Sequence, residues 1–308
     1  MSEVLNWFTV ALAPAYAAYT LAALGNAVIE RSGVLNIAID GFFVLSSALA
    51  YTYAILLSQT LGSGPLATYT AVALTALTTA VLYSLFTTLN TVLPISQGAV
   101  GLSFMFAGYG LGAVVGNIGR LVFSVQRVRV DYLGVSGWGS AVAYVLLVVA
   151  AALTHLLLYG LRLGVLIRAV GEDPRAVSQV GVNVAYIRLL AGLVGGLAVG
   201  LGGAVFTLWR VGGWSQGQGL NHGWLAYAIS VAGWRYPLLV ALVSVFFSSL
   251  YVLLPHIQRL GLPVEISMAT PYIVSVAVMV LVSLVPRRGS VFAEPKALGR
   301  EYFREERA

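Results

Sequence analysis

Long apolar runs dominate this sequence, and most of them contain about 20 residues, the length of an α-helix that crosses a hydrocarbon core of about 30 Å. Hydrophobic residues make up 59% of the chain and charged residues only 9%. That is too little charge to cover a water-facing surface, because soluble domains carry roughly 25% charged residues. The sequence therefore predicts an all-α polytopic membrane protein with about nine transmembrane helices, within a range of about eight to ten.

Some of these expected helices are broken or short. The segment 224–233 is shorter than a full crossing, so we expect it to be tilted, re-entrant or buried in protein. The membrane domain is expected to cover residues 1–286 with a cytoplasmic polar loop at 162–188, and residues 287–308 form a polar, partly disordered tail. The expected spans are 4–28, 41–60, 66–91, 98–116, 138–159, 189–209, 224–233, 238–254 and 266–285.

The basic residues predict the orientation of the chain, because Arg and Lys collect on the cytoplasmic side of membrane proteins. If the loop 162–188 and the tail are both cytoplasmic, twelve of the 17 basic residues lie inside. The five outside are Arg120, Arg127, Arg129, Arg210 and Arg259. We therefore expect the N-terminus outside and the C-terminus inside. The net charge of +6 then reflects topology and contact with membrane lipid rather than nucleic acid.

The longest internal polar interruption lies at residues 160–190, between two apolar segments. Asp173 is a favourable N-cap and Pro174 suits the first helical position, so we expect a short helix from Pro174 to about Val180, ended by Gly181. One face of this helix carries an apolar strip of Ala176, Val177 and Val180. Such a helix can enter a groove on a soluble partner, and the alternative is a helix that lies on lipid.

Six polar residues near spans or breaks are candidates for a substrate path: Asn36, Asp40, Ser96, Gln97, Ser103 and Asn221. Asp40 is the strongest of them, because an acid at the start of an apolar run is costly unless it faces protein or water. The alternative is local hydrogen bonding, in which Asp40 would bond to Asn36 or to backbone groups and order the loop.

Glycines recur every four residues in two of the expected spans. Such stripes allow helices to pack backbone to backbone in lipid, so we expect them to mark helix contacts. They are Gly108, Gly112 and Gly116 in one span and Gly192, Gly196 and Gly200 in another.

No catalytic or metal-binding set is recognisable in the sequence. Its three histidines, His155, His222 and His256, lie in different segments, and it contains no cysteine, phosphate loop or nucleophile elbow. We therefore expect a non-enzymatic chain that binds no cofactor itself. Energy for active transport must come from another subunit or from an ion gradient.

Three motifs resemble the permease subunits of ABC importers for branched-chain amino acids, simple sugars and nucleosides, and are most similar to the shorter nucleoside/simple-sugar permease. The first is GNAVIERSGVLNIAIDG at 25–41, and the second is LRLGVLIRAVGEDPRAVSQVGVN at 161–183. The third runs from Trp224 through AGWRYP to the tail. Together they cover most of the chain in the family's order.

The resemblance implies that the short helix is a coupling helix, which docks on a separate ABC ATPase subunit that holds ATP and Mg²⁺. It also implies a second homologous permease subunit, an extracytoplasmic substrate-binding protein, and a multi-pass location in the cytoplasmic membrane of a prokaryote. The motif carries the coupling role to Gly171, Glu172, Asp173, Pro174, Arg175, Ala176 and Gly181, and Val177 and Val180 complete the apolar strip.

The chain departs from the family's pattern at several positions. Asn26 and Asp40 stand where the family usually has Glu, and Ala38 replaces Gly. Ser96 and Met105 replace two asparagines, so the substrate can differ from that of relatives. The expected function is that of an ABC importer permease for nucleosides or simple sugars. The alternatives are an ion-coupled secondary transporter and a non-transporting membrane scaffold.

Overall fold

The computed structural model describes residues 2–62, 64–93, 95–123, 137–259, 263–285 and 291–302. All regular secondary structure within these ranges is helical, and two π-helical turns, η1 and η2, extend α5 and α8. The elements are α1 Ser2–Arg31, α2 Ile39–Leu61, α3 Pro65–Val92, α4 Gln97–Phe123, α5 Gly137–His155, η1 Leu156–Gly160, α6 Arg162–Glu172, α7 Pro174–Gln179, α8 Val184–Val205, η2 Phe206–Val211, α9 His222–Ala232, α10 Pro237–Arg259 and α11 Val264–Ser283.

Seven helices in the described ranges are long and apolar enough to cross a membrane: α1, α2, α3, α4, α5 with η1, α8 with η2, and α10. The expected short segment is α9, with 11 residues. The apolar part of α11 covers only Ala269–Ser283 by the same measure. The expected count of about nine crossings therefore stays a prediction. The orientation does too, since Arg127, Arg129 and several tail arginines lie outside the described residues.

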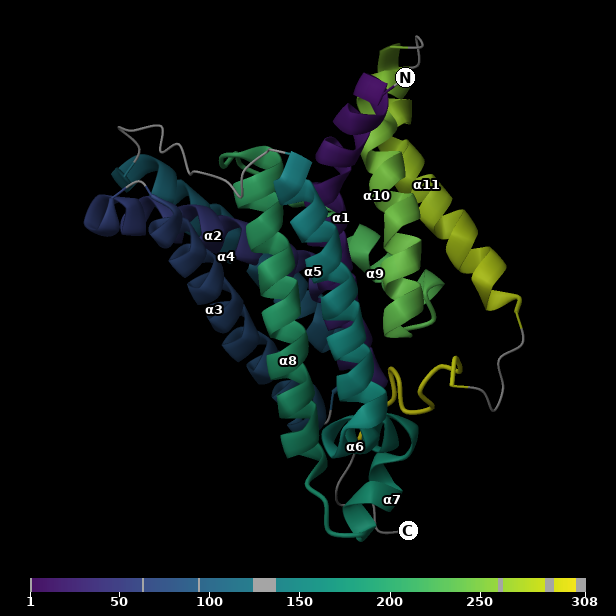
Figure 1. Ribbon diagram of the computed structural model, residues 1–308. Coiled ribbons are helices and arrows are strands. Elements are labelled where there is room, and N and C mark those ends of the chain that lie inside the picture. The colour runs from purple at the N-terminus through teal and green to yellow at the C-terminus, as the bar shows by residue number, and fades with distance from the viewer. Residues whose placement is uncertain are drawn as a thin grey trace.

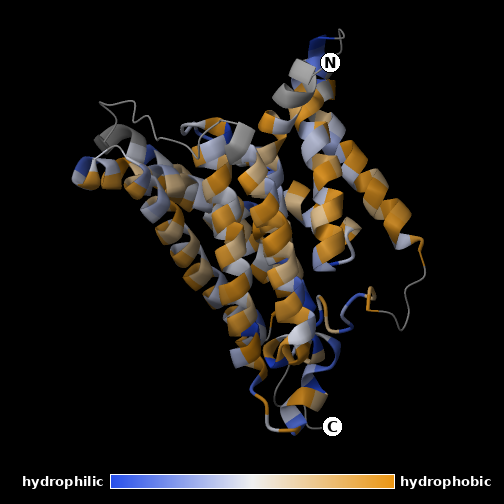
Figure 2. Ribbon diagram, viewed as in Figure 1, coloured by the Kyte–Doolittle hydropathy of each residue, from blue (hydrophilic) through white to orange (hydrophobic). Residues whose placement is uncertain are grey.

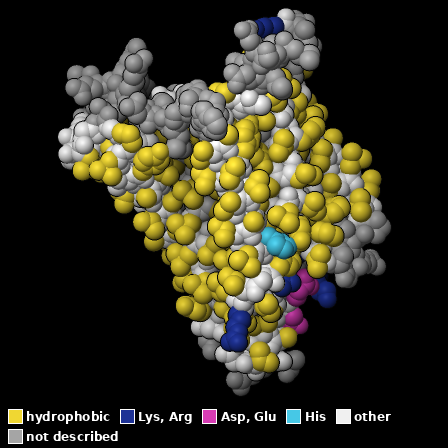
Figure 3. Space-filling view, viewed as in Figure 1, with side chains coloured by type: hydrophobic (Ala, Val, Ile, Leu, Met, Phe, Trp, Pro, Cys, Tyr) yellow, Lys and Arg dark blue, Asp and Glu magenta, His cyan; other side chains and the backbone are white. Residues whose placement is uncertain are grey.

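The long helices run side by side, with α6 and α7 at one end of the molecule, which we call the α6–α7 end (Figure 1). Apolar residues cover the helices along their length, and polar residues gather at the α6–α7 end (Figure 2). The most apolar 18-residue stretches of α1 and α2 are 72% buried, whereas the corresponding stretch of α5 is 22% buried. The first two helices therefore form the centre of the bundle, and α5 presents apolar side chains on the outer surface (Figure 3).

Both glycine stripes lie at helix contacts, as the sequence predicts. Gly108 packs against the backbone of Gly41 in α2, and Gly112 lies beside Val44. A Cβ atom added at Gly196 would lie 2.6 Å from the Cβ atom of Tyr83 and 2.8 Å from the Cα atom of Ala80, both in α3. Because there is no room for a side chain at these positions, α8 and α3 approach backbone to backbone.

A tight turn joins α9 to α10 at the α6–α7 end. Its residues Trp234 and Arg235 have φ angles of 56° and 53°, which are uncommon for residues other than glycine. Arg31, at the end of α1, holds this turn by donating to the carbonyl of Trp234 at 2.8 Å and to that of Arg235 at 3.3 Å. A single guanidinium thus stabilises a strained reversal about 200 residues away along the chain.

Two carboxylates flank the side chain of Arg235. Glu30 is fully buried and pairs with the Arg235 Nε atom, whereas Glu294 is 57% exposed and pairs with Nη1 at 2.9 Å. Burial lowers the pKa of Arg235, but the two carboxylates outweigh it, so the pKa is raised above its usual value. The guanidinium therefore stays charged and ties α1 to the α9–α10 turn and the tail.

The described part of the tail, residues 291–302, is packed against the bundle. Arg31 donates to the carbonyls of Val291 at 2.9 Å and Ala293 at 3.0 Å. The amide of Ala297 donates to the carbonyl of Gly171 at 2.9 Å. The tail contributes backbone groups to these contacts, and backbone contacts cannot be read from the side-chain composition of the tail.

Replacing Gly196 with Leu should destabilise the protein by about 1–3 kcal/mol, because the side chain forces α8 away from α3. The thermal unfolding midpoint of the detergent-purified protein measures the effect. Gly110→Leu is the matched control, since a Cβ atom there meets nothing within 4 Å. Equal midpoints for the two variants would contradict backbone contact between these helices.

Replacing Glu30 with Gln should cost about 3 kcal/mol of stability, because it leaves a buried guanidinium without its buried counter-charge. Glu294→Gln removes the exposed partner of the same guanidinium and should cost less than about 1 kcal/mol. Thermal unfolding of both variants under one condition tests this ranking. A larger loss in Glu294→Gln would overturn it.

Candidate functional site

The predicted short helix is present as α7, Pro174–Gln179. The Asp173 side chain caps it by accepting from the backbone amides of Arg175 and Ala176, each at 3.0 Å. Gly181 follows the helix with a φ angle of 87°, as expected for a C′ glycine. Asn183 then caps α8 by accepting from the Tyr186 amide at 3.2 Å. Residues 173–183 therefore specify the start of α7, the end of α7 and the start of α8.

The structure divides the predicted apolar strip of α7 into two parts. Val177 packs against the cluster that contains Ile167 and Ile187. Ala176 is exposed, and Val180 is 78% exposed although its side chain is apolar. Val177 therefore anchors the helix on the bundle, and the other two residues are the ones available to a partner.

The segment before α7 touches three other parts of the α6–α7 end. Gly171 is buried, and an added Cβ atom would collide with the carbonyl oxygen of Arg31 and lie 3.2 Å from the amide of Gly33. Its own carbonyl accepts from Ala297 of the tail. The segment that leads into α7 therefore contacts the end of α1, the α1–α2 linker and the tail.

The α1–α2 linker, residues 32–38, is buried and held by side chains from other helices. Arg188 of α8, fully buried, donates through Nε to the Ser32 carbonyl at 3.1 Å. Gln97 of α4 accepts from the Leu35 amide at 2.7 Å and donates to the Gly33 carbonyl at 3.3 Å. The path candidate Gln97 thus forms part of the linker's support, and it also donates to the carbonyl of Arg300 at 2.7 Å.

Asn36 lies in the same linker and bonds with two other buried polar side chains. It donates to the Asn26 Oδ1 atom at 2.8 Å and accepts from the Tyr83 hydroxyl at 3.2 Å. Asn26 is one of the positions at which this chain departs from the family pattern. The shorter amide there suits a hydrogen bond to Asn36, which connects α1, the linker and α3.

Asp40 is fully buried near the start of α2, and its carboxylate faces the N-terminus of α9. Oδ1 accepts from the Gly223 amide at 2.7 Å and from the Trp224 amide at 3.2 Å. Oδ2 accepts from the Asn221 amide at 3.0 Å and from the Tyr109 hydroxyl at 2.6 Å. The carboxylate therefore offsets the positive end of the α9 dipole and satisfies amides that the helix itself leaves unpaired.

The remaining path candidates are more exposed and do not join Asp40 in one cluster. Ser96 and Asn221 are exposed, and the exposed Ser103 donates to the Ala99 carbonyl of its own helix at 2.9 Å. Only the backbone of Asn221 contacts Asp40. The six candidates thus fall into the buried linker supports Asn36 and Gln97, the α9 cap Asp40, and three exposed positions.

Sequence reasoning missed Glu30, Arg31 and Arg235 as a connected group. Glu30 and Arg31 lie within the ERSGV part of the first motif, and Arg235 lies within AGWRYP. Their occurrence in the two motifs was the available signal, but pairing residues about 200 positions apart needs the fold. Within the described residues, no group of three or more His, Cys, Asp or Glu residues is placed to hold a metal ion.

Several known proteins are similar to this chain over most of its length. Guanosine ABC transporter permease protein NupQ of Bacillus subtilis is 27% identical over 305 residues, with 93% of each chain covered. Nucleoside ABC transporter permease protein NupC of Lactococcus lactis is 25% identical, covering 91% of this chain and 92% of its own. The provisionally named glucose ABC transporter permease protein TsgC13 of Haloferax volcanii is 28% identical, covering 92% and 94%.

No solved structure shows a significant match to this chain. A sequence profile of the family described as branched-chain amino acid transport system / permease component matches residues 8–283, which is most of the chain. The chain therefore belongs to this family of ABC transporter permeases.

Proposed function

We propose that this chain is the transmembrane permease subunit of an ATP-driven importer for nucleosides or simple sugars. The observation that carries the proposal is the family match over residues 8–283. The names of the relatives, which specify guanosine, nucleosides and glucose, support the substrate class. The chain would act with an ABC ATPase that binds ATP and Mg²⁺, a second homologous permease and an extracytoplasmic substrate-binding protein, in the cytoplasmic membrane of a prokaryote.

The coupling role is assigned to residues 171–181, with the α6–α7 end facing the cytoplasm. The exposed Ala176 and Val180 would enter a groove on the ATPase, and Glu172 and Arg175 would flank that contact. Closure of the ATPases around ATP would then displace α7. The close contact of Gly171 with Arg31 and Gly33 carries this displacement to α1 and to the linker that leads into α2.

The two central helices are suited to respond to that displacement. They are the most buried spans, and Asp40 joins the start of α2 to the start of α9. A shift of the linker would therefore move two helix ends in the interior together. This coordinated movement is our proposal for the change between inward-open and outward-open states.

The hydrogen bonds of Asp40 also favour this proposal over the alternative of an ion-coupled carrier. A carboxylate offers about four acceptor sites, and Asp40 already accepts four hydrogen bonds. A coupling ion would have to displace the amides that hold α9. We therefore place Asp40 in the supporting structure of the transporter rather than at an ion site.

Replacing Val180 with Asp should reduce co-purification of the ATPase by roughly tenfold or more, because it puts a charge in an apolar contact. The exposed side chain leaves the thermal midpoint of the permease unchanged. Gln179→Asp adds the same charge at the neighbouring exposed position and should have little effect. Undiminished ATPase binding by Val180→Asp would remove this residue from the contact.

Reconstituted vesicles with the full complex should take up nucleoside or sugar only when ATP is supplied, and ion gradients alone should drive no uptake.

Asp40→Asn should lower stability by about 2 kcal/mol, since it loses charge-assisted bonds to the α9 amides. Tyr109→Phe removes only one of the four bonds and should cost about 1 kcal/mol. Gradient-driven uptake by the permease alone, abolished in Asp40→Asn, would favour the carrier. A complete complex that takes up no ligand with ATP would favour the scaffold.

A further inference from the structure

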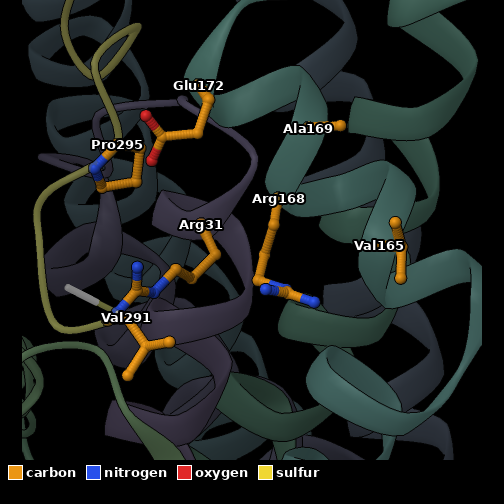
Figure 4. Close-up of a pocket in the computed structure, with 7 residues that line it drawn as sticks. All are labelled: Arg31, Val165, Arg168, Ala169, Glu172, Val291 and Pro295. Carbon is orange, nitrogen blue, oxygen red and sulfur yellow. The ribbon is translucent and has the colours of Figure 1, made fainter. Parts of the chain in front are cut away.

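A pocket of about 390 Å³ opens at the α6–α7 end, within the size range of small-molecule sites. It is formed by the end of α1, one face of α6 and the tail (Figure 4). Its lining residues are Arg31, Val165, Arg168, Ala169, Glu172, Val291 and Pro295. Of these seven lining residues, only Glu172 also belongs to the segment assigned to coupling.

Two arginines supply the positive charge on one side of the pocket, and they differ in how their donors are bonded. Arg31 donates hydrogen bonds to four backbone carbonyls, so its positive charge is held in one place. Arg168 donates through Nε to the Leu158 carbonyl at 2.9 Å, and its guanidinium lies 4.6 Å from the centre of the Tyr159 ring. Within the described part of the chain, the terminal nitrogens of Arg168 bond to no protein group. These nitrogens can bind one phosphate.

The negative side of the pocket comes from Glu172. It lies four residues after Arg168, so both side chains leave the same face of α6. Even so, the two do not form an ion pair with each other in the structure as described. In Figure 4 the guanidinium groups of Arg31 and Arg168 lie toward one end of the pocket, and the Glu172 carboxylate lies toward Pro295. Opposite charges are thus held apart across a cavity.

An apolar flank leads from the membrane-spanning part of the chain to the pocket. The exposed side chains of Leu156, Leu161 and Val165 follow one another from η1 into α6. The candidate span Ser140–Gly160 ends just before α6, so the pocket follows directly on the end of a span. Along this path the chain presents apolar surface, then a cation at Arg168, then an anion at Glu172.

We propose that this pocket binds the headgroup of a phospholipid that carries both a phosphate and a primary amine, such as a phosphatidylethanolamine. The phosphate binds Arg168 in the field of Arg31, the ammonium binds Glu172, and the acyl chains lie along the exposed apolar flank. A headgroup without an amine leaves Glu172 unpaired beside added negative charge. Because α1, α6 and the tail all line the pocket, a bound lipid joins these three parts.

Native mass spectrometry of the full-length protein with defined lipids tests the proposal. Phosphatidylethanolamine, phosphatidylcholine and phosphatidylglycerol with identical acyl chains are compared at equal concentrations. Arg168→Gln should reduce phosphatidylethanolamine binding by roughly tenfold or more. Arg162→Gln is the matched control, because Arg162 is exposed on the same helix and does not line the pocket. Equal lipid binding by the two variants would overturn the proposal.

A second variant tests the role of the amine. Glu172→Gln should abolish the preference for phosphatidylethanolamine over phosphatidylglycerol, and an unchanged preference would refute the assignment of Glu172. Soluble glycerophosphoethanolamine distinguishes the source of the headgroup: it should compete only weakly, whereas displacement at the concentration of the lipid would identify a soluble ligand and overturn the lipid proposal. If Arg168→Gln does not fold, Arg168→Lys, which keeps the charge and loses the planar fork, should show intermediate binding.

Discussion

A buried linker between α1 and α2 is the constraint on which the rest of the structure depends. Residues 32–38 are not helical, so their backbone groups lack the partners that a helix supplies. In an apolar bundle each unsatisfied group costs several kcal/mol. Arg188 of α8 and Gln97 of α4 provide missing backbone partners, and Asn26 of α1 accepts from the Asn36 side chain. The positions of α1, α4 and α8 are thereby fixed around one short stretch of chain.

The same requirement explains why polar contacts at the α6–α7 end reach so far along the sequence. Arg31 supports both the α9–α10 turn and the tail, and Gln97 contacts both the linker and Arg300. Gly171 adds α6 to this group by direct backbone contact. Through Gly171, the segment that leads into the six-residue helix α7 therefore belongs to a connected polar layer that joins α1, α4 and the tail.

Local signals in the sequence were sufficient for the seven long apolar helices and for α7. Apolar runs of about 20 residues predicted the spans, and Asp173, Pro174 and Gly181 predicted a capped helix that the structure contains. The Glu30–Arg235 pair could not be predicted in this way, because 205 residues separate its members. The packed tail was missed for a related reason: composition indicates solvation, but it does not show which carbonyls a distant arginine will bind.

The buried network also explains the preference for arginine over lysine, since Lys296 is the single lysine among the 17 basic residues. Arg31, Arg188 and Arg235 are buried where several acceptors surround one side chain. A planar guanidinium with five N–H donors can serve such a site, whereas an ammonium offers three donors from one point. These arginines are therefore required for packing. Without these three, nine of the twelve basic residues expected inside remain against five outside, so the predicted orientation does not depend on the buried arginines.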